Sequence, residues 1–117
     1  MKNMENKSNN EAVKFINCCK HDVVLNDGRV FKPSGAIAEV SMETSEPVDG
    51  IAIQRFGKIT GLPEPKENTF YICSALVAER AAVEGRNDVV SPATRHPLAV
   101  RNEKQQVVSV PFFLRIS

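Results

Sequence analysis

Turn-forming residues interrupt this chain at short intervals, and this spacing is the feature that most limits how it can fold. Asn26-Asp27-Gly28 is a strong tight-turn signal, Pro33-Ser34-Gly35 supplies a second turn, and Gly61-Leu62-Pro63-Glu64-Pro65 is a stiff stretch. Each proline of the last stretch fixes its own φ and moves the preceding residue out of the helical region, so a regular helix cannot pass through residues 61–65. The short runs between them favour strands.

The composition of these runs is typical of short β-strands. We expect strands over residues 13–17, 22–25, 29–32, 36–40, 51–56, 69–73, 98–101 and 106–115. The second and third of these form a hairpin around Asn26-Asp27-Gly28. Residues 42–50 are acidic and contain Pro47, so we expect an exposed excursion between strands there. Pro111 favours an edge position or a bulge in the last strand.

One segment, residues 75–83, is typical of a helix. Ser74 is a suitable N-cap, because its hydroxyl can accept a hydrogen bond from a free backbone N–H of the first turn. Gly85 is well placed to end the helix. The sequence therefore predicts an α+β fold that is mainly β, with a small antiparallel sheet or a partly open barrel and one short helix.

The length of 117 residues is that of one ordinary domain with a single core. Residues 1–12 are polar with almost nothing to bury, so we expect a flexible N-terminal tail. We expect residues 13–117 to form a single globular domain.

No apolar stretch approaches the roughly 20 residues that a membrane-spanning helix needs, and the first ten residues lack the apolar core of a secretory signal. These observations predict a cytoplasmic protein without a membrane contact. Cys18, Cys19 and Cys73 are odd in number, which favours reduced thiols over a disulfide framework.

Fifteen basic and fourteen acidic residues give a formal net charge of +1. This balance provides no general attraction to nucleic acid, and the chain has one tyrosine and no tryptophan to stack bases. Nucleic-acid binding is therefore not expected, and any anion site must be local.

No known catalytic motif is present. Cys18, Cys19 and His21 lack the second, spaced ligand pair of a structural zinc site, and nothing in the sequence brings His21 or His96 beside a thiol. Glycine-rich phosphate motifs are absent as well. We therefore expect a protein that is not an enzyme, with no catalytic residue, no metal and no cofactor.

The segment from Tyr71 to Arg101 contains the best candidate for a ligand site. The helix start at Ser74 offers free N–H groups, and arginine pairs well with phosphate. The candidate ligand-binding residues are Tyr71, Ser74, Arg80, Arg86 and Arg101, and the expected ligand is an anionic, nucleotide-like small molecule. The plainer interpretation is that Ser74 only caps the helix while the arginines are solvated or pair with nearby carboxylates.

Several motifs together resemble a family of small uncharacterised proteins encoded by phages, prophages and bacteria. The "GLPEP" run of residues 61–65 followed by the "YI-x-S" of residues 71–74 is the most specific part, and the similarity covers about residues 13–115. The family pattern has a glycine at Asn68 and a valine at Cys73. The resemblance implies an origin in a mobile element and a location inside a bacterial host, without an established activity.

Three hypotheses for the function follow. The first, suggested by the resemblance, is a counter-defence sponge: an oligomer that sequesters a nucleotide-derived immune signal without turnover. The second is a protein–protein interaction module, either an inhibitor of a host protein or a virion accessory. In that case Phe112 or Phe113 could lie at a subunit or partner contact. The third is a hydrolase for the same signal, with His21 or His96 as base.

Overall fold

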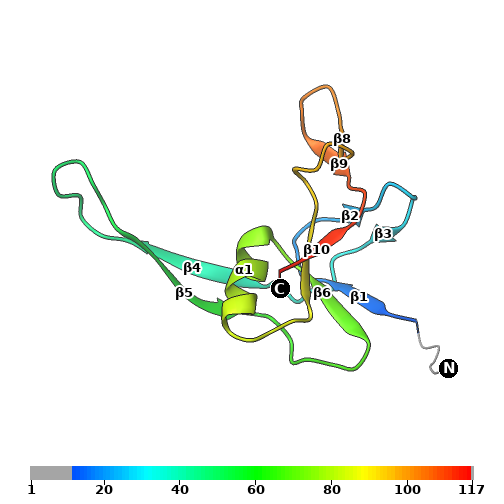
Figure 1. Ribbon diagram of the computed structural model, residues 1–117, viewed down its shortest axis with the longest axis horizontal. Coiled ribbons are helices and arrows are strands. Elements are labelled where there is room, and N and C mark those ends of the chain that lie inside the picture. Colours follow the sequence, from blue (N-terminus) through cyan, green and yellow to red (C-terminus); the bar gives the residue numbers. More distant parts are fainter. Residues whose placement is uncertain (1–11, 117) are drawn as a thin grey trace.

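The structure is a computed structural model that describes residues 12–116 (Figure 1). The predicted tail at residues 1–12 lies, except for Ala12, outside the described residues. The elements in this range are β1 (Lys14–Asn17), β2 (Val23–Val24), β3 (Val30–Phe31), β4 (Glu39–Thr44), β5 (Gln54–Thr60), β6 (Thr69–Ile72), α1 (Ala75–Val83), β7 (Val89–Pro92), β8 (Val100–Arg101), β9 (Val107–Ser109) and β10 (Phe113–Arg115). The predicted α+β, mainly β class with one short helix is confirmed.

Four strands form the central sheet in the order β1-β6-β7-β10. β1 and β7 both run parallel to β6, and β10 runs antiparallel to β7. β6 and β7 can pair in parallel because α1 carries the chain back to the end of the sheet at which β6 begins. The three two-stranded sheets, β2-β3, β4-β5 and β8-β9, are antiparallel. The described strands close no barrel.

Helix α1 covers one face of the central sheet and begins and ends where the sequence predicts. Ser74 accepts a hydrogen bond from the Val77 N–H at 3.2 Å, and Gly85 has a φ of 86° after the helix end. Val77 and Ala81 pack on this face with Tyr71, which is fully buried. No helix of residues 12–116 is long and apolar enough to cross a membrane.

The second face of the sheet carries aromatic side chains. Because side chains alternate along a strand, Phe70 and Ile72 of β6 point away from α1 while Tyr71 points toward it. Phe15 of β1 and Phe113 of β10 join them on this second face. The β2-β3 hairpin covers only part of this cluster, so a phenylalanine-rich surface stays partly open.

The β4-β5 hairpin leaves the body of the molecule as a long projection (Figure 1). We call residues 39–60 the arm. The prediction that residues 42–50 lack regular structure is wrong, because Met42–Thr44 belong to β4 and Val48 and Ile51 exchange two backbone hydrogen bonds around an Asp49-Gly50 turn. Hydrogen bonding to β5 orders this segment, although its acidic composition is typical of an irregular loop. The predicted exposure of this segment is confirmed.

Two local features concern residues named in the sequence analysis. Asn68 has a φ of +54°, a left-handed conformation that asparagine adopts more readily than most residues with a side chain. The expectation of one strand over residues 106–115 is wrong, because Pro111 divides this stretch into β9 and β10. The break lets β9 pair with β8 and β10 pair with β7.

Candidate functional site

Four phenylalanines from four strands meet on the second face of the sheet. Phe15 and Phe70 are register neighbours on β1 and β6, and their ring centroids lie 6.0 Å apart. Phe113 approaches Phe15 to 5.1 Å, and Phe31 lies 5.5 Å from each of these two rings. These are ordinary distances for packed aromatic pairs. None of the four rings is fully buried, so the cluster offers aromatic surface to a ligand.

An open pocket of about 430 Å³ lies over this cluster. We call it the phenylalanine pocket. Its lining consists of Val13, Phe15, Leu25, Arg29, Phe70, Val90, Pro111, Phe112, Phe113 and Arg115. The volume falls in the range of about 300–1,000 Å³ that is typical of small-molecule sites. The lining is apolar except for two arginines.

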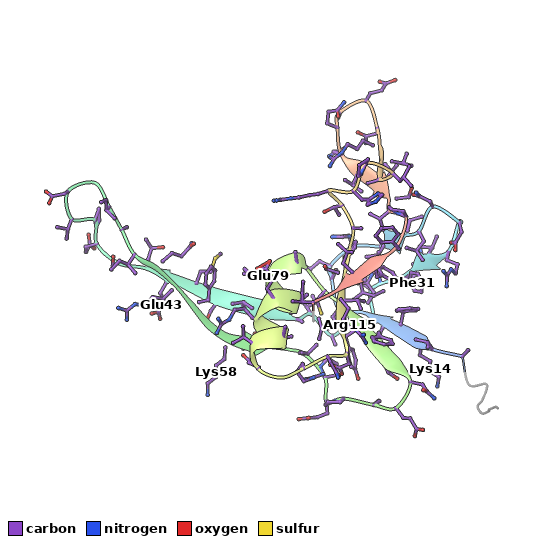
Figure 2. All side chains as sticks on the ribbon, in the orientation of Figure 1. Lys14, Phe31, Glu43, Lys58, Glu79 and Arg115 are labelled. Carbon is purple, nitrogen blue, oxygen red and sulfur yellow. The ribbon has the colours of Figure 1, made fainter. Side chains whose placement is uncertain are left out.

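The two arginines reach the pocket from different elements. Arg115 is cross-strand to Val90 and two residues from Phe113 on β10, so its side chain leaves the sheet on the phenylalanine side. Its side chain makes no ion pair or hydrogen bond with any described residue, and Arg115 is exposed. Figure 2 labels its position at β10. Its charge is therefore available to an anion.

Arg29 follows the tight turn of the β2-β3 hairpin. Its Nε donates to Asp27 Oδ2 and its backbone N–H donates to Asp27 Oδ1, both at 3.0 Å. That backbone N–H holds the pKa of the Asp27 carboxyl below its ordinary value. Both side chains are more than half exposed, so the pair contributes little to stability and its guanidinium can also reach a ligand.

The residues proposed from the sequence lie elsewhere. Tyr71 is fully enclosed, and its hydroxyl donates to the Glu64 carbonyl oxygen at 2.7 Å. Burial, assisted by the Asp88 carboxylate, raises the pKa of Tyr71. The Arg86 guanidinium lies 5.9 Å from the centre of the Tyr71 ring. These two residues are the only pair of the proposed five for which the structure shows such a contact among the described residues.

Arg86 is held by three hydrogen bonds. It donates from Nε and one terminal nitrogen to the two carboxylate oxygens of Asp88, and from the same terminal nitrogen to the Pro63 carbonyl, each at 2.9 Å. The bond to Asp88 raises the pKa of Arg86. The side chain thus connects the "GLPEP" run to the loop after α1. Its Nε and one terminal nitrogen are already occupied by these hydrogen bonds.

The remaining three candidates are separated from one another. Ser74 caps α1, and Arg80 lies one turn before the end of the same helix, with its Nε enclosed and unpartnered within the described range. Arg101 of β8 donates to the carbonyls of Gln105 and Thr94 at 2.8 and 3.0 Å. None of the five proposed residues lines the phenylalanine pocket.

Ser74 does line a second hollow of about 330 Å³, beside the start of α1. Lys20 and His21 also line it, and Lys20 pairs with Glu39 at 3.4 Å. Cys18 and Cys19 contribute to the same wall. The charge of Lys20 is therefore already balanced in part, which makes this hollow a weaker anion site than the phenylalanine pocket.

The three cysteines are free, and their environment disfavours thiolate chemistry. Burial raises the pKa of Cys18, Cys19 and Cys73, so few thiolates form at neutral pH. His96 packs edge-to-face on Phe112 at 4.9 Å. Within residues 12–116, no three His, Cys, Asp or Glu side chains gather closely enough to hold a metal ion.

Comparisons with protein-family models, with curated proteins and with solved structures found no match to this chain.

The phenylalanine pocket was missed in the sequence analysis, which placed the candidate ligand site between Tyr71 and Arg101. The sequence does carry a partial signal. Side chains alternate between the two faces of a strand along residues 13–17 and 69–73, so Phe15 and Phe70 can share one face of a sheet when the two strands pair. Nothing local indicates that Arg29 and Arg115 meet them, because the contact depends on how β3 and β10 sit in the fold.

Proposed function

We propose that this protein is a binding protein that sequesters an anionic ligand with a flat, apolar body, such as a nucleotide-derived signal, and does not turn it over. The observation that carries the proposal is the phenylalanine pocket, in which stacked aromatic rings lie beside Arg29 and Arg115. The resemblance to small phage proteins supports an immune signal of the host as the ligand and a counter-defence role.

The chemistry of the pocket suits such a ligand. Aromatic rings stack on nucleobases with about 1–3 kcal/mol per base. Phe112 is 42% exposed and Phe70 is partly exposed, so both can offer a ring face or edge. Arginine binds phosphate in a bidentate manner, and the two guanidiniums provide positive charge beside an apolar wall.

The lining also supports retention without turnover. None of its ten residues is a serine, threonine, cysteine, histidine, lysine, tyrosine or carboxylic acid. Arginine stays protonated in proteins and does not act as a base. A hydrolase reading would need a general base in the pocket, and His21 and His96 are not among the lining residues.

The test is native mass spectrometry against a panel of linear and cyclic nucleotides and ADP-ribose derivatives, followed by titration calorimetry with any nucleotide that binds. We expect stoichiometric binding and recovery of an unchanged ligand after denaturation. The double variant Arg29→Gln and Arg115→Gln should weaken binding at least tenfold, and Phe112→Ala should weaken it several-fold.

The matched control is Arg55→Gln, which removes an exposed arginine on the arm and should leave binding unchanged. A ligand returned with an altered mass would establish an enzyme. If the double variant binds as well as the wild type, the phenylalanine pocket is not the site. If no member of the panel binds, the proposed ligand class is wrong.

A protein–protein interaction module is the second candidate, and the exposed arm favours it. Met42 and Phe56 are a cross-strand pair on the arm and are 54% and 40% exposed. Apolar side chains gathered on a projecting element are typical of a protein contact.

A further inference from the structure

We infer that the phenylalanine pocket recognises its ligand by flat aromatic area and negative charge, and that it does not read the hydrogen-bonding edge of a base. The juxtaposition that carries this inference is a wall of phenylalanine rings beside Arg29 and Arg115, with no acceptor side chain among the described residues of the lining. The inference rests on the proposed function and names its ligand class: aromatic phosphates in general, whichever base or other ring they carry.

A pocket that distinguishes one base from another needs hydrogen-bond acceptors as well as donors. Adenine, guanine and cytosine each carry an exocyclic amino group, which must donate to the protein or to water. Among the described residues, the side chains that line the pocket are aliphatic, aromatic or arginine. Arginine carries five N–H donors and no acceptor. None of these side chains can therefore receive the amino group of a base.

Four backbone carbonyls of the lining are already hydrogen-bonded. Those of Leu25, Arg29, Val90 and Phe112 accept from backbone N–H groups at distances between 2.8 and 3.1 Å. The first two bonds belong to the β2-β3 turn, and the other two connect β7 to its neighbouring chain segments. A base edge directed at these carbonyls would compete with the bonds that hold the fold.

Asp27 and His96 contact lining residues but already hold donors. The Asp27 carboxylate oxygens accept from the Arg29 backbone N–H and Nε, each at 3.0 Å. His96 packs on Phe112, and its Nδ1 accepts from the Leu98 N–H at 3.1 Å. Both acceptors therefore serve the protein's own N–H groups.

The rings themselves are indifferent to the identity of a base, because every base has a π-face on which an aromatic ring can stack. Phe112 is exposed, and Phe15 and Phe70, with ring centroids 6.0 Å apart, are partly exposed in the same lining. The pocket is open, so the amino edge of a stacked base can stay in water. Affinity then follows the size of the ring rather than the pattern on its edge.

The two arginines contribute unequally to the charge of the pocket. Asp27 partly offsets Arg29, whereas the side chain of Arg115 makes no ion pair or hydrogen bond with any described residue. A phosphate therefore gains most from Arg115, since arginine and phosphate form charge-assisted hydrogen bonds. This contact is the same for every ring that carries the phosphate.

The test is titration calorimetry of the full chain with ligands that differ in one property at a time. Adenosine, guanosine and inosine monophosphates share ring size and charge but differ at the base edge. The ligand 1-naphthyl phosphate has a flat ring without a hydrogen-bonding edge, and adenosine lacks the phosphate. We expect the three nucleotides to differ less than fivefold in dissociation constant. We expect 1-naphthyl phosphate to bind no more than fivefold more weakly than adenosine monophosphate, and adenosine to bind at least tenfold more weakly.

A variant connects these affinities to the pocket. Arg115→Gln should weaken adenosine monophosphate and 1-naphthyl phosphate alike, by at least fivefold, because both use the same phosphate contact. The matched control is Arg55→Gln, which removes an exposed arginine of the arm and should change neither affinity.

The outcomes separate this inference from the proposed function. If nucleotides bind but any of these limits is exceeded, the pocket reads more than ring area and charge, and the inference is overturned while the proposed function stands. If 1-naphthyl phosphate binds and no nucleotide does, the pocket still takes aromatic phosphates and the proposed function fails instead. If neither binds, both are wrong.

Discussion

Arg86 shows how a sequence signal for ligand binding can have a structural origin. Its guanidinium satisfies both carboxylate oxygens of Asp88 and the carbonyl of Pro63, and it lies against the ring of Tyr71. The "GLPEP" run, the buried tyrosine and the loop after α1 therefore form one clamp. These residues hold the sheet to its connections, which leaves Arg29 and Arg115 as the better candidates for an anion.

The Cys73 thiol makes the fold less stable at alkaline pH. Burial raises the pKa of this thiol above its ordinary value of 9.0, so the folded chain keeps the proton that the unfolded chain loses. Its contribution to stability is complete below pH 9 and declines as the pH rises above it. Each pH unit above 9 costs about 1.4 kcal/mol for one such thiol.

We expect Cys73→Val to lose about 1.4 kcal/mol less stability than the wild type between pH 8 and pH 10. Valine is similar in size and has no proton to lose. Urea unfolding at the two pH values measures the difference. Val89→Ala is the control, because it weakens the same core without changing a titrating group. Parallel pH dependences for the wild type and Cys73→Val would contradict the assignment.

Gly61 fixes how the arm joins the body. It follows β5 with a φ of +83°, and a Cβ at this position would lie 1.9 Å from the carbonyl oxygen of Ile37. Neither the conformation nor the contact leaves room for a side chain. Gly50, in the turn at the arm tip, has a similar φ of +78° but open space around it.

Alanine variants of the two glycines therefore distinguish two contributions to the loss of unfolding free energy, the strain of a left-handed backbone and a steric clash. Gly50→Ala should lose about 1–2 kcal/mol, the cost of a left-handed backbone for a residue with a side chain. Gly61→Ala should lose more than about 3 kcal/mol, because the backbone near Ile37 must also move. Denaturant midpoints of both variants provide the comparison. Equal losses would show that the close approach to Ile37 is not important.

Elements that depend on neighbours in sequence were predicted well. Helix α1 was predicted with its observed bounds, because Ser74 and Gly85 act through local backbone groups. The β2-β3 hairpin was predicted for the same reason, since Asn26-Asp27-Gly28 determines its own turn. The parallel pairing of β1 with β6 was not predicted, because no local signal brings residues so distant in sequence together.

The arm and the pocket were missed for related reasons. The bulge between Val40 and Met42 shifts the register, so β4 and β5 do not show matching alternation in the sequence. The acidic residues and Pro47 then suggested an irregular loop. The phenylalanine pocket draws on β1, β3, β6 and β10 together, and only the assembled sheet puts Arg115 on the side of Phe113.

The molecule as a whole combines a small body with two projecting hairpins of different character (Figure 1). The arm carries the exposed cross-strand pair Met42 and Phe56. The β8-β9 hairpin joins Val100–Arg101 to Val107–Ser109 and is also largely exposed, but it turns through a polar loop at residues 102–105. If both hairpins are isolated in solution, their amides should exchange with solvent at similar, fast rates.

Hydrogen exchange tests this equivalence. We expect peptides covering residues 42–56 and residues 100–109 to exchange faster than peptides covering β6 and β7, because the hairpins lack the cover that α1 gives the central sheet. Protection of residues 42–56 as strong as that of the central sheet would mean that the arm is covered in solution.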